Sequence, residues 1–412
     1  MKLISEFLKV IHDRGFVHQV TDLENLDKLL LKKNGTAYIG FDCTAPSLHV
    51  GSLIQIMMLR WFQKTGNIPI VLVGGGTTKI GDPSGKDSAR PILSTKIINK
   101  NKLSIKKVFK NYLNFSNKAN GALMIDNEDW LDKINYISFL REFGSFFSIN
   151  KMLSLESIKA RLDREQNLSF LEFNYPILQA YDFLKLNEKF DCNLQMGGSD
   201  QWGNIVNGVE LIKRYSNNQT YGLTTPLITL ATGAKMGKTE NGAIWLDEKY
   251  LSAYDYWQFW RNVDDRDVMK FLKMFTDIDI SEINALEEKN INELKILLAN
   301  KATAMLHGED AAQNSEQAAK EAFSGNSLGS NLPSVKIETK QLENNINIID
   351  LIILSKAENS KSEIRRLIKG KAIKINDAVV SDEKFIINQE LFSENYLKLS
   401  IGKKRHIKIE LS

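Results

Sequence analysis

The sequence contains little cysteine and no long apolar run. Its 412 residues include two cysteines, Cys43 and Cys192, and no Cys-x-x-Cys pair or Cys/His cluster, which argues against a disulfide framework or a structural zinc site. No apolar stretch approaches the ~20 residues of a membrane span. The first segment carries Glu6, Asp13 and Arg14, which is typical of an amphipathic helix and not of a signal peptide. We therefore expect a cytoplasmic protein, or one of another reducing compartment, with no membrane partner and no metal held by its side chains.

Net charge is also small, +4 at pH 7, and it is unevenly placed. Residues 345–412 contain 13 Lys or Arg against 9 Asp or Glu, so this segment carries the whole surplus. Such an asymmetry is typical of an appendage that binds a polyanion. The chain is also longer than the size at which one hydrophobic core stops growing, which predicts two or three domains.

The first chemical signal lies between residues 36 and 52. A short apolar strand ends at Asp42, the chain turns through Pro46, and helical periodicity is predicted from Ser47. A strand that enters a helix through a polar turn places a site at the carboxyl edge of an α/β sheet. His49 and Gly51 would lie in the first helical turn, where free N–H groups attract phosphate and a glycine leaves room for a flat ring. By itself, this string is more often a helix cap or a solvated turn.

Two further strand-to-turn segments predict a parallel sheet. Residues 68–73 are apolar and run into a Gly-rich stretch, and residues 193–196 lead through another Gly-rich turn into a helix over 205–213. The linked strands form a βαβ unit. The first Gly-rich stretch is not a Walker A loop, because Asp87 follows Lys86 in place of Ser or Thr. By contrast, residues 1–34 and 94–171 are predicted to be largely helical.

A polar stripe and a basic loop are candidate binding elements. Tyr175, Gln179 and Asp182 follow one another at i, i+4 and i+7 in a predicted helix over 173–186, so they share one face. The stripe is either solvated or a binding face, and its place within an apolar helix favours binding. Lys235 and Lys238 lie in a Gly-rich loop that is either simply exposed or a mobile clamp on a polyphosphate.

The second half of the chain is predicted to be helical and then α+β. Residues 249–323 are helical in pattern, and residues 324–333 form a linker of small and turn residues. We therefore predict a catalytic domain over 1–227 with a helical insertion at about 94–171 and a mobile loop over 228–246. A helical domain over 247–323, a linker over 324–344 and a small C-terminal domain over 345–412 complete the prediction.

Five segments together resemble the bacterial-type tyrosyl-tRNA synthetases, a family of class I aminoacyl-tRNA synthetases. The similarity covers most of the chain, in the family's order. Its motifs are Tyr38-Ile-Gly-Phe-Asp42-Cys-Thr-Ala-Pro-Ser-Leu-His49-Val-Gly51-Ser52, Asp82-Pro-Ser-Gly-Lys86, Tyr175 with Gln179-Ala-Tyr-Asp182, Gly197-Gly-Ser-Asp200-Gln201-Trp202-Gly-Asn204, and Lys235-Met-Gly-Lys238-Thr239.

The resemblance implies a role for each matching residue. Positions that hold the substrate phenol match Tyr38 and Asp182. Positions on the ammonium side match Asp82, Thr77, Tyr175, Gln179 and Gln201. Positions that receive ATP match Asp42, Gly51, Ser52, Gly198, Asp200 and Lys238. Positions that contact the γ-phosphate or pyrophosphate match Thr44, His49, Lys86, Arg90, Lys235, Lys238 and Thr239. The implied reaction is attack of the L-tyrosine carboxylate on the α-phosphate of ATP, bound with Mg²⁺, followed by transfer of tyrosyl to the 3′-terminal ribose of tRNA(Tyr).

The resemblance also implies a fold and partners. The fold would be α/β, with a Rossmann-like parallel-sheet catalytic domain, an α-helical middle domain on the anticodon side and a small S4-like RNA-binding domain. RNA-binding positions would be Lys361, Arg365, Arg366, Lys369, Lys371, Lys403, Lys404 and Arg405. The family is homodimeric, and an apolar cluster over residues 139–149 is predicted to be either core or subunit interface.

Two departures and three alternatives complete the sequence argument. Ser52 stands where the motif more usually has a second His or Asn, and Cys43 stands where many relatives have Pro, which we interpret as a turn variant without a redox role.

A tryptophanyl-tRNA synthetase would share the ATP motifs but would lack the pair formed by Tyr38 and Asp182, and the tail. A small-molecule nucleotidylyltransferase would lack the tail, and an inactive RNA-binding relative would lack the lysine loop.

Overall fold

The computed structural model describes most of the chain in two compact units. It describes residues 2–33, 35–84, 92–233, 236–239, 242–324, 334–338, 342, 346–358, 360–392, 396–402 and 405–411. One unit comprises residues 1–250 with 264–294, and the other comprises residues 251–263 with 295–412. None of the described helices is both long and apolar enough to cross a bilayer.

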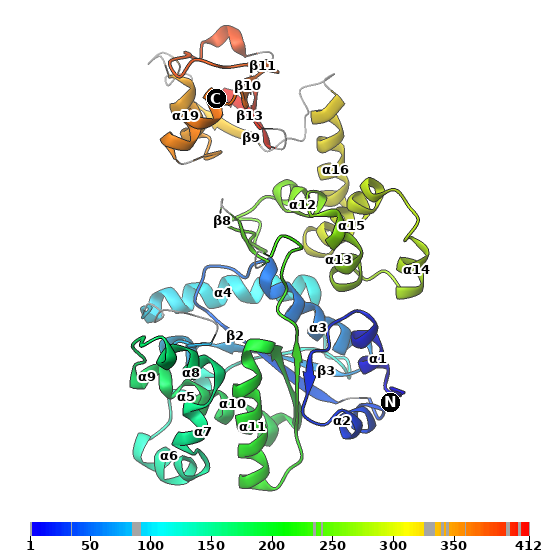
Figure 1. The fold of residues 1–412 in the computed structure, drawn as a ribbon, viewed down its shortest axis with the longest axis vertical. Helices are drawn as coiled ribbons and strands as arrows, with labels where there is room; N and C mark the ends of the chain where they lie inside the picture. Colours follow the sequence, from blue (N-terminus) through cyan, green and yellow to red (C-terminus); the bar gives the residue numbers. More distant parts are fainter. Residues whose placement is uncertain are drawn as a thin grey trace. The chain divides into compact units, whose positions relative to one another are not determined.

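The first unit is built on a six-stranded sheet (Figure 1). The strand order is β1-β6-β5-β2-β3-β4, and every pairing is parallel except that of β1 with β6. The bounds are β1 Gln19–Val20, β2 Thr36–Asp42, β3 Ile68–Gly74, β4 Leu123–Asp126, β5 Cys192–Gly198 and β6 Tyr221–Thr225. The predicted Rossmann-like parallel sheet is therefore confirmed. Because β2, β3 and β5 are central and parallel, their carboxyl ends meet at one edge, where the predicted motifs follow them.

Helices cover the sheet and connect its strands. Leu53–Lys64 (α3) joins β2 to β3, and Tyr175–Phe190 (α10) packs against Trp202–Ser216 (α11). The predicted helical stretch over 1–34 is wrong, because Glu6–Asp13 (α1) and Leu23–Leu30 (α2) are separate helices with β1 between them. Ser5 and Asp22 cap them individually, each accepting a hydrogen bond from the first turn.

The predicted helical insertion also contains the edge strand β4. Four residues, Leu-Met-Ile-Asp, are too short for periodicity to separate a strand from a helix. The insertion's helices are α4 Thr95–Tyr112, α5 Glu128–Leu131, α6 Tyr136–Phe143, α7 Ile149–Leu153, α8 Glu156–Asp163 and α9 Phe170–Phe173. Val268–Phe275 (α13) and Ile280–Ala285 (α14) also belong to this unit. The Arg14 guanidinium holds the end of α13, donating to the carbonyls of Lys273, Thr276 and Ile278.

The second unit contains helices and a five-stranded sheet. Its helices include α12 Ala253–Arg261, α16 Glu309–Ser324, α18 Ile348–Leu354 and α19 Lys361–Lys369, and most of α15 Ile291–His307, from residue 295 on. The sheet has the order β11-β10-β12-β13-β9, with β9 Ser334–Ile337, β10 Ile373–Ile375, β11 Ala378–Val379, β12 Tyr396–Ile401 and β13 Arg405–Leu411. Its core includes Ile337, Ile364 and Ile409, all buried. Since β9 pairs with β13, a proposed C-terminal domain that keeps this sheet whole begins at or before Ser334.

Candidate active site

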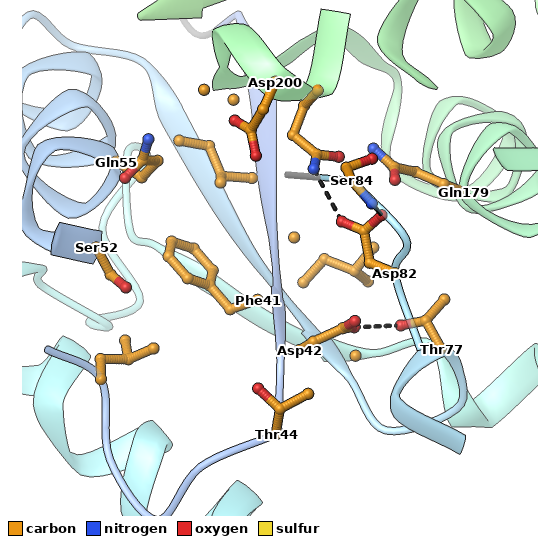
Figure 2. A pocket seen from close by; sticks show the side chains of 18 of the residues that line it. Phe41, Asp42, Thr44, Ser52, Gln55, Thr77, Asp82, Ser84, Gln179 and Asp200 are labelled. Carbon is orange, nitrogen blue, oxygen red and sulfur yellow. Dashed lines mark hydrogen bonds between the residues drawn. The ribbon is translucent and has the colours of Figure 1, made fainter. Parts of the chain in front are cut away.

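A pocket of about 410 Å³ opens at the carboxyl ends of β2, β3 and β5 (Figure 2). Its volume lies in the range of small-molecule sites. The structure brings fourteen of the predicted residues into its lining, from positions up to 163 residues apart in the sequence. They are Tyr38, Asp42, Thr44, His49, Gly51, Ser52, Thr77, Asp82, Tyr175, Gln179, Asp182, Gly198, Asp200 and Gln201.

Tyr38 and Asp182 are buried polar residues in the lining of the pocket. The Tyr38 hydroxyl is buried, has no hydrogen-bond partner among the described residues, and belongs to a side chain that is 1% exposed. Burial raises the pKa of Tyr38 well above its usual value, with the nearby Asp182 carboxylate adding to the shift, so the phenol stays protonated. A buried hydroxyl without a partner costs free energy, and a bound polar ligand would recover it.

Two residues that the sequence analysis missed position Asp182. Trp130 Nε1 donates to Asp182 Oδ1 at 2.7 Å, and Asn127 Nδ2 donates to Oδ2 at 2.9 Å. Burial raises the pKa of Asp182 to about 7, although these two hydrogen bonds oppose the shift. Asn127 and Trp130 follow β4, the strand hidden within the predicted helical insertion. Recognition of β4 as a strand would have pointed to both residues, because its carboxyl end lies at the same edge of the sheet as those of β2, β3 and β5.

Asp42 lies in the middle of the pocket and accepts hydrogen bonds from Thr77 and Tyr175. Thr77 Oγ1 donates to its Oδ1 at 2.7 Å (Figure 2), and the Tyr175 hydroxyl donates to its Oδ2 at 3.1 Å. Asn127 also donates to Thr77 Oγ1 at 3.0 Å, so one amide is bonded both to Asp182 and to the threonine that donates to Asp42. Burial raises the pKa of Tyr175, and the carboxylates of Asp42 and Asp82 raise it further.

A network of amides positions Asp82 in the pocket lining. Gln201 Nε2 donates to Asp82 Oδ2 at 2.9 Å, and the Ser84 N–H donates to Oδ1 at 2.8 Å. Asn204 Nδ2 donates to the side-chain oxygens of Gln179 and Gln201, each at 3.1 Å. Asn204 thus fixes the direction of both amides, and Figure 2 shows Gln179, Ser84 and Asp82 on the same side of the pocket. Acceptors on this wall suit a cationic group of a ligand.

His49 begins a short 3₁₀ turn, Val50–Ser52, that precedes α3. The predicted start of the helix at Ser47 is therefore early by several residues. His49 Nδ1 accepts the Gly51 N–H at 3.0 Å, so in the neutral ring the proton lies on Nε2, where it can be donated to an anion. Packing also explains why residue 51 is a glycine. A Cβ at this position would lie 2.7 Å from His49 Cε1 and 2.9 Å from Met236 O.

The backbone after the lysine loop is tied to the His49 segment. Val50 N–H donates to Ile244 O at 2.8 Å, and Leu246 N–H donates to Leu48 O at 2.9 Å. A Cβ on Gly237, whose φ is +102°, would lie 2.8 Å from His49 Nδ1. The two predicted ATP motifs therefore meet in space, although His49 and Gly237 are 188 residues apart in the sequence.

Some predicted site residues fall outside this description. Five of them lie outside the described residues: Lys86, Arg90, Lys235, Lys403 and Lys404. For two more, Lys238 and Thr239, the structure describes the backbone only. They form strand β7, Lys238–Thr239, which pairs with β8, Gly242–Ala243. Among the described side chains, no group of three His, Cys, Asp or Glu could hold a metal ion. Cys43 is fully buried, and burial raises the pKa of its thiol to about 12, which makes it unreactive.

The predicted RNA-binding residues of α19 form an exposed face. Ile364 and Ile368 are buried, and Arg365, Arg366 and Lys369 are exposed on the same helix. Arg365 pairs with Glu383, Arg366 with Glu363, and Lys361 with Asp350. Lys369 and Lys371 have no ion pair among the described residues. Arg405 differs, because it is half-buried and donates to Ala357 O at 2.8 Å.

Comparisons with known proteins agree with this geometry. Residues 31–324 match the family tRNA synthetases class I (W and Y), and residues 326–409 match the Tyrosine--tRNA ligase SYY-like C-terminal domain. The chain is 65% identical to a tyrosine–tRNA ligase of Pelagibacter ubique, covering 99% of this chain and all of that protein, and 52% identical to that of Brucella abortus, covering 98% of each. A C-terminally truncated mitochondrial tyrosyl-tRNA synthetase of Aspergillus nidulans superposes with a TM-score of 0.70 at 30% identity, covering 77% of this chain and 94% of that one.

Proposed function

The chain belongs to the tyrosine–tRNA ligases of class I, and we propose how its pocket divides the work of that reaction. The protein joins tyrosine to its tRNA with the use of ATP. Tyr38 and Asp182 bind the phenol of tyrosine, because they supply a buried hydroxyl without a partner and a carboxylate oriented by two donors. These two buried polar residues in the pocket lining are the observation that carries the assignment.

The ammonium of tyrosine binds among Asp82, Tyr175, Gln179 and Gln201. Asp82 and the Gln179 amide supply acceptors, and Figure 2 shows Thr77 beside Asp42, on the same side of the view as Asp82. In this arrangement the tyrosine carboxylate points toward the His49 segment. The carboxylate is already a nucleophile, so the pocket contributes position and charge stabilisation and no general base.

ATP binds along Asp42, Gly51, Ser52, Gly198 and Asp200. Gly51 and Gly198 both line the pocket, and neither position tolerates a side chain, because a Cβ there would collide with His49 or Asp200. His49 and Thr44 donate to the phosphates, and Lys86, Arg90, Lys235, Lys238 and Thr239 stabilise the charge that moves onto pyrophosphate. Support for the lysine role comes from the paired backbones that hold the Lys238 loop against His49.

Mg²⁺ accompanies ATP in this proposal. Because the described side chains include no three-residue metal cluster, the ion would be bound chiefly by the phosphates, as is usual for Mg²⁺ at nucleotide sites. Its chemistry there is neutralisation of phosphate charge. The protein's own residues position the two substrates.

We assign the RNA-binding role to the exposed basic face of α19. Lys361, Arg365, Arg366, Lys369 and Lys371 would bind phosphates of the tRNA, with Lys403, Lys404 and Arg405 as a second basic group. Arg405 contributes less in this assignment, because its guanidinium is already bound to Ala357 O. We place the reaction in the cytoplasm, in keeping with two buried free cysteines.

Amino-acid-dependent exchange of pyrophosphate into ATP tests this function. Tyrosine is expected to support exchange, and phenylalanine and tryptophan are expected to fail at equal concentration. Phenylalanine leaves the buried Tyr38 hydroxyl without a hydrogen-bond partner and offers no hydroxyl to Asp182, and the indole of tryptophan does not fit a pocket shaped for a phenol. Adding tRNA(Tyr) should then give tyrosyl-tRNA. Exchange that is as fast with phenylalanine or tryptophan as with tyrosine would contradict the pocket assignment.

We also propose that the protein is a homodimer that associates through the insertion. Within the apolar cluster over 139–149, Phe143 belongs to the buried core, whereas Leu140 and Ile149 are 51% and 58% exposed. Tyr136, Ile137 and Phe170 add further exposed apolar area in the same insertion. Apolar patches of this kind mark association surfaces.

Light scattering on a Leu140→Asp variant tests the homodimer. The wild type is expected to have twice the chain mass, and the variant is expected to shift toward the monomer, because a carboxylate would be buried without a partner in the interface. Leu31→Asp is the control, since Leu31 is 49% exposed at the end of α2 and outside the insertion. A monomeric wild type, or equal dissociation of the control, would overturn the proposal.

A further inference from the structure

Helix α4, Thr95–Tyr112, carries an unbalanced positive charge that no assignment above uses. Its 18 residues include six lysines and no Asp or Glu. Lys102 is paired, with Asp126 and Glu128. The other five lysines, Lys96, Lys100, Lys106, Lys107 and Lys110, form no ion pair with any described residue.

Four of these lysines form one exposed stripe. Lys96, Lys100, Lys107 and Lys110 are exposed, whereas Lys106 is half-buried. Their spacings of four, seven and three residues keep them on one helix face and spread them over about 21 Å at 1.5 Å per residue. The opposite face is buried through Ile98, Asn101, Ile105, Val108, Phe109 and Tyr112.

The stripe lowers the stability of the helix that carries it. Like charges at i, i+4, such as Lys96 with Lys100, each cost a few tenths of a kcal/mol. Lys96 also lies in the first turn, where the helix dipole disfavours a cation. Lysine is depleted from protein–protein contacts, so another protein is a poor match for this face. A polyanion matches it, because phosphates would neutralise all four charges.

The buried face of α4 connects the stripe to the active site. Asn101 Nδ2 donates to Cys43 O at 2.9 Å, one residue before the pocket-lining Thr44. The Phe109 ring contacts that of Phe41, another lining residue, with centroids 4.8 Å apart. Ser104 Oγ donates at 2.8 Å to Asp247, in the segment that continues from the lysine loop. Figure 1 shows α4 and α3 neighbouring one another in the first unit, and α3 starts directly after Ser52.

We propose that the exposed lysines of α4 bind backbone phosphates of the tRNA arm whose 3′ end enters the pocket. The proposal rests on the proposed function, because that function requires a tRNA terminus to reach the pocket beside this helix. Phosphate contacts of this kind position a nucleic acid without reading its sequence. Lys96, Lys100, Lys107 and Lys110 therefore act on tRNA binding and not on tyrosine activation.

Three variants test the proposal by separating tyrosine activation from transfer to tRNA. The first combines Lys96→Gln with Lys100→Gln, and the second combines Lys107→Gln with Lys110→Gln. The third carries all four changes. Pyrophosphate exchange with tyrosine should stay within about twofold of wild type, since no changed residue lines the pocket. The KM for tRNA should rise by roughly tenfold for each pair at 0.15 M salt, and the slope of log affinity against log salt should fall by about 0.7–0.9 for each phosphate that a lysine no longer neutralises.

The control pair is Lys9→Gln with Lys32→Gln, which removes two exposed lysines of α1 and the end of α2 that have no ion pair among the described residues. Its tRNA KM and salt slope should match wild type. A quadruple Lys→Arg variant should keep tRNA binding and shows that the helix tolerates substitution. The proposal would be overturned if the tRNA KM and the salt slope of the Gln variants were unchanged, or if the tRNA KM of the control pair rose as much as theirs. It would also be overturned if the Gln variants lost pyrophosphate exchange as much as they lost tRNA charging. If wild type itself does not activate tyrosine, the proposed function fails first.

Discussion

Replacing Asp182 with alanine is expected to lower kcat/KM for tyrosine in pyrophosphate exchange by roughly 100-fold, or about 3 kcal/mol. The variant removes the carboxylate that accepts from the phenol, and it also leaves Trp130 Nε1 and Asn127 Nδ2 without their acceptor in a buried site. Selectivity for tyrosine over phenylalanine should also fall. In the variant, the substrate hydroxyl has no carboxylate to donate to, so phenylalanine no longer lacks a hydrogen bond that tyrosine makes at this position. Exchange kinetics with both amino acids measure this directly.

Asn127→Ala is the graded companion to this variant. It keeps the carboxylate but removes a 2.9 Å donor to it and a 3.0 Å donor to Thr77, so we expect a smaller loss, about tenfold. Tyrosine activation by Asp182→Ala at the wild-type rate would show that the phenol binds elsewhere. A loss with Asn127→Ala larger than that with Asp182→Ala would show that Asp182 is not the group through which Asn127 acts.

The titration of Asp182 adds a check that does not depend on activity. Burial raises the pKa of Asp182 to about 7, whereas the same carboxyl group in the unfolded chain has a pKa of about 4. Between these two pH values the folded state therefore holds a proton that the unfolded chain has released. Stability from this group is therefore fully present below about pH 4 and is lost as pH rises toward 7. Asp182→Asn, which cannot ionise, should gain stability relative to wild type by about 2–3 kcal/mol between pH 5 and pH 8. Denaturant melts of both proteins at the two pH values measure it, and a constant difference would contradict the raised pKa.

A chain that ends at Ser324 is expected to activate tyrosine normally and to charge tRNA at least 100-fold more slowly. The truncation removes α19 and the whole five-stranded sheet, which has its own buried core, and it leaves every residue of the pocket in place. The Aspergillus synthetase, solved in a C-terminally truncated form, aligns with 77% of this chain, which supports folding of the remainder. Exchange and aminoacylation assays on the same preparation separate the two effects.

A full-length variant controls for the loss of the domain itself. Changing Lys361, Arg365, Arg366, Lys369 and Lys371 to Gln keeps Ile364, Ile368 and the core of the domain, and removes the positive face. We expect a large part of the charging defect to reappear, with a shallower salt dependence. Equal loss of exchange and charging in the truncated chain would contradict separate roles for the two parts.

Local sequence patterns were sufficient to predict the fold class and to recognise the resemblance to the synthetase family. Each strand-to-turn-to-helix motif is local, so its residues could be matched one by one to those of the synthetase family that it resembles. The parallel sheet then required the carboxyl ends of β2, β3 and β5 to meet at one edge. For this reason fourteen of the predicted residues line one pocket. The charge of the C-terminal segment likewise depends on composition alone.

Packing between segments that are distant in the sequence sets which groups hold the functional residues in place. Asn127 and Trp130 reach Asp182 across more than 50 residues, and Gly237 packs on His49 across 188, through contacts set by strand order and side-chain packing that leave no periodic signal. The strand β4 and the break between α1 and α2 were missed for a related reason, since segments of two to four residues gain their structure from neighbouring strands. The exposed stripe on α4 became visible only when the buried face of that helix was known.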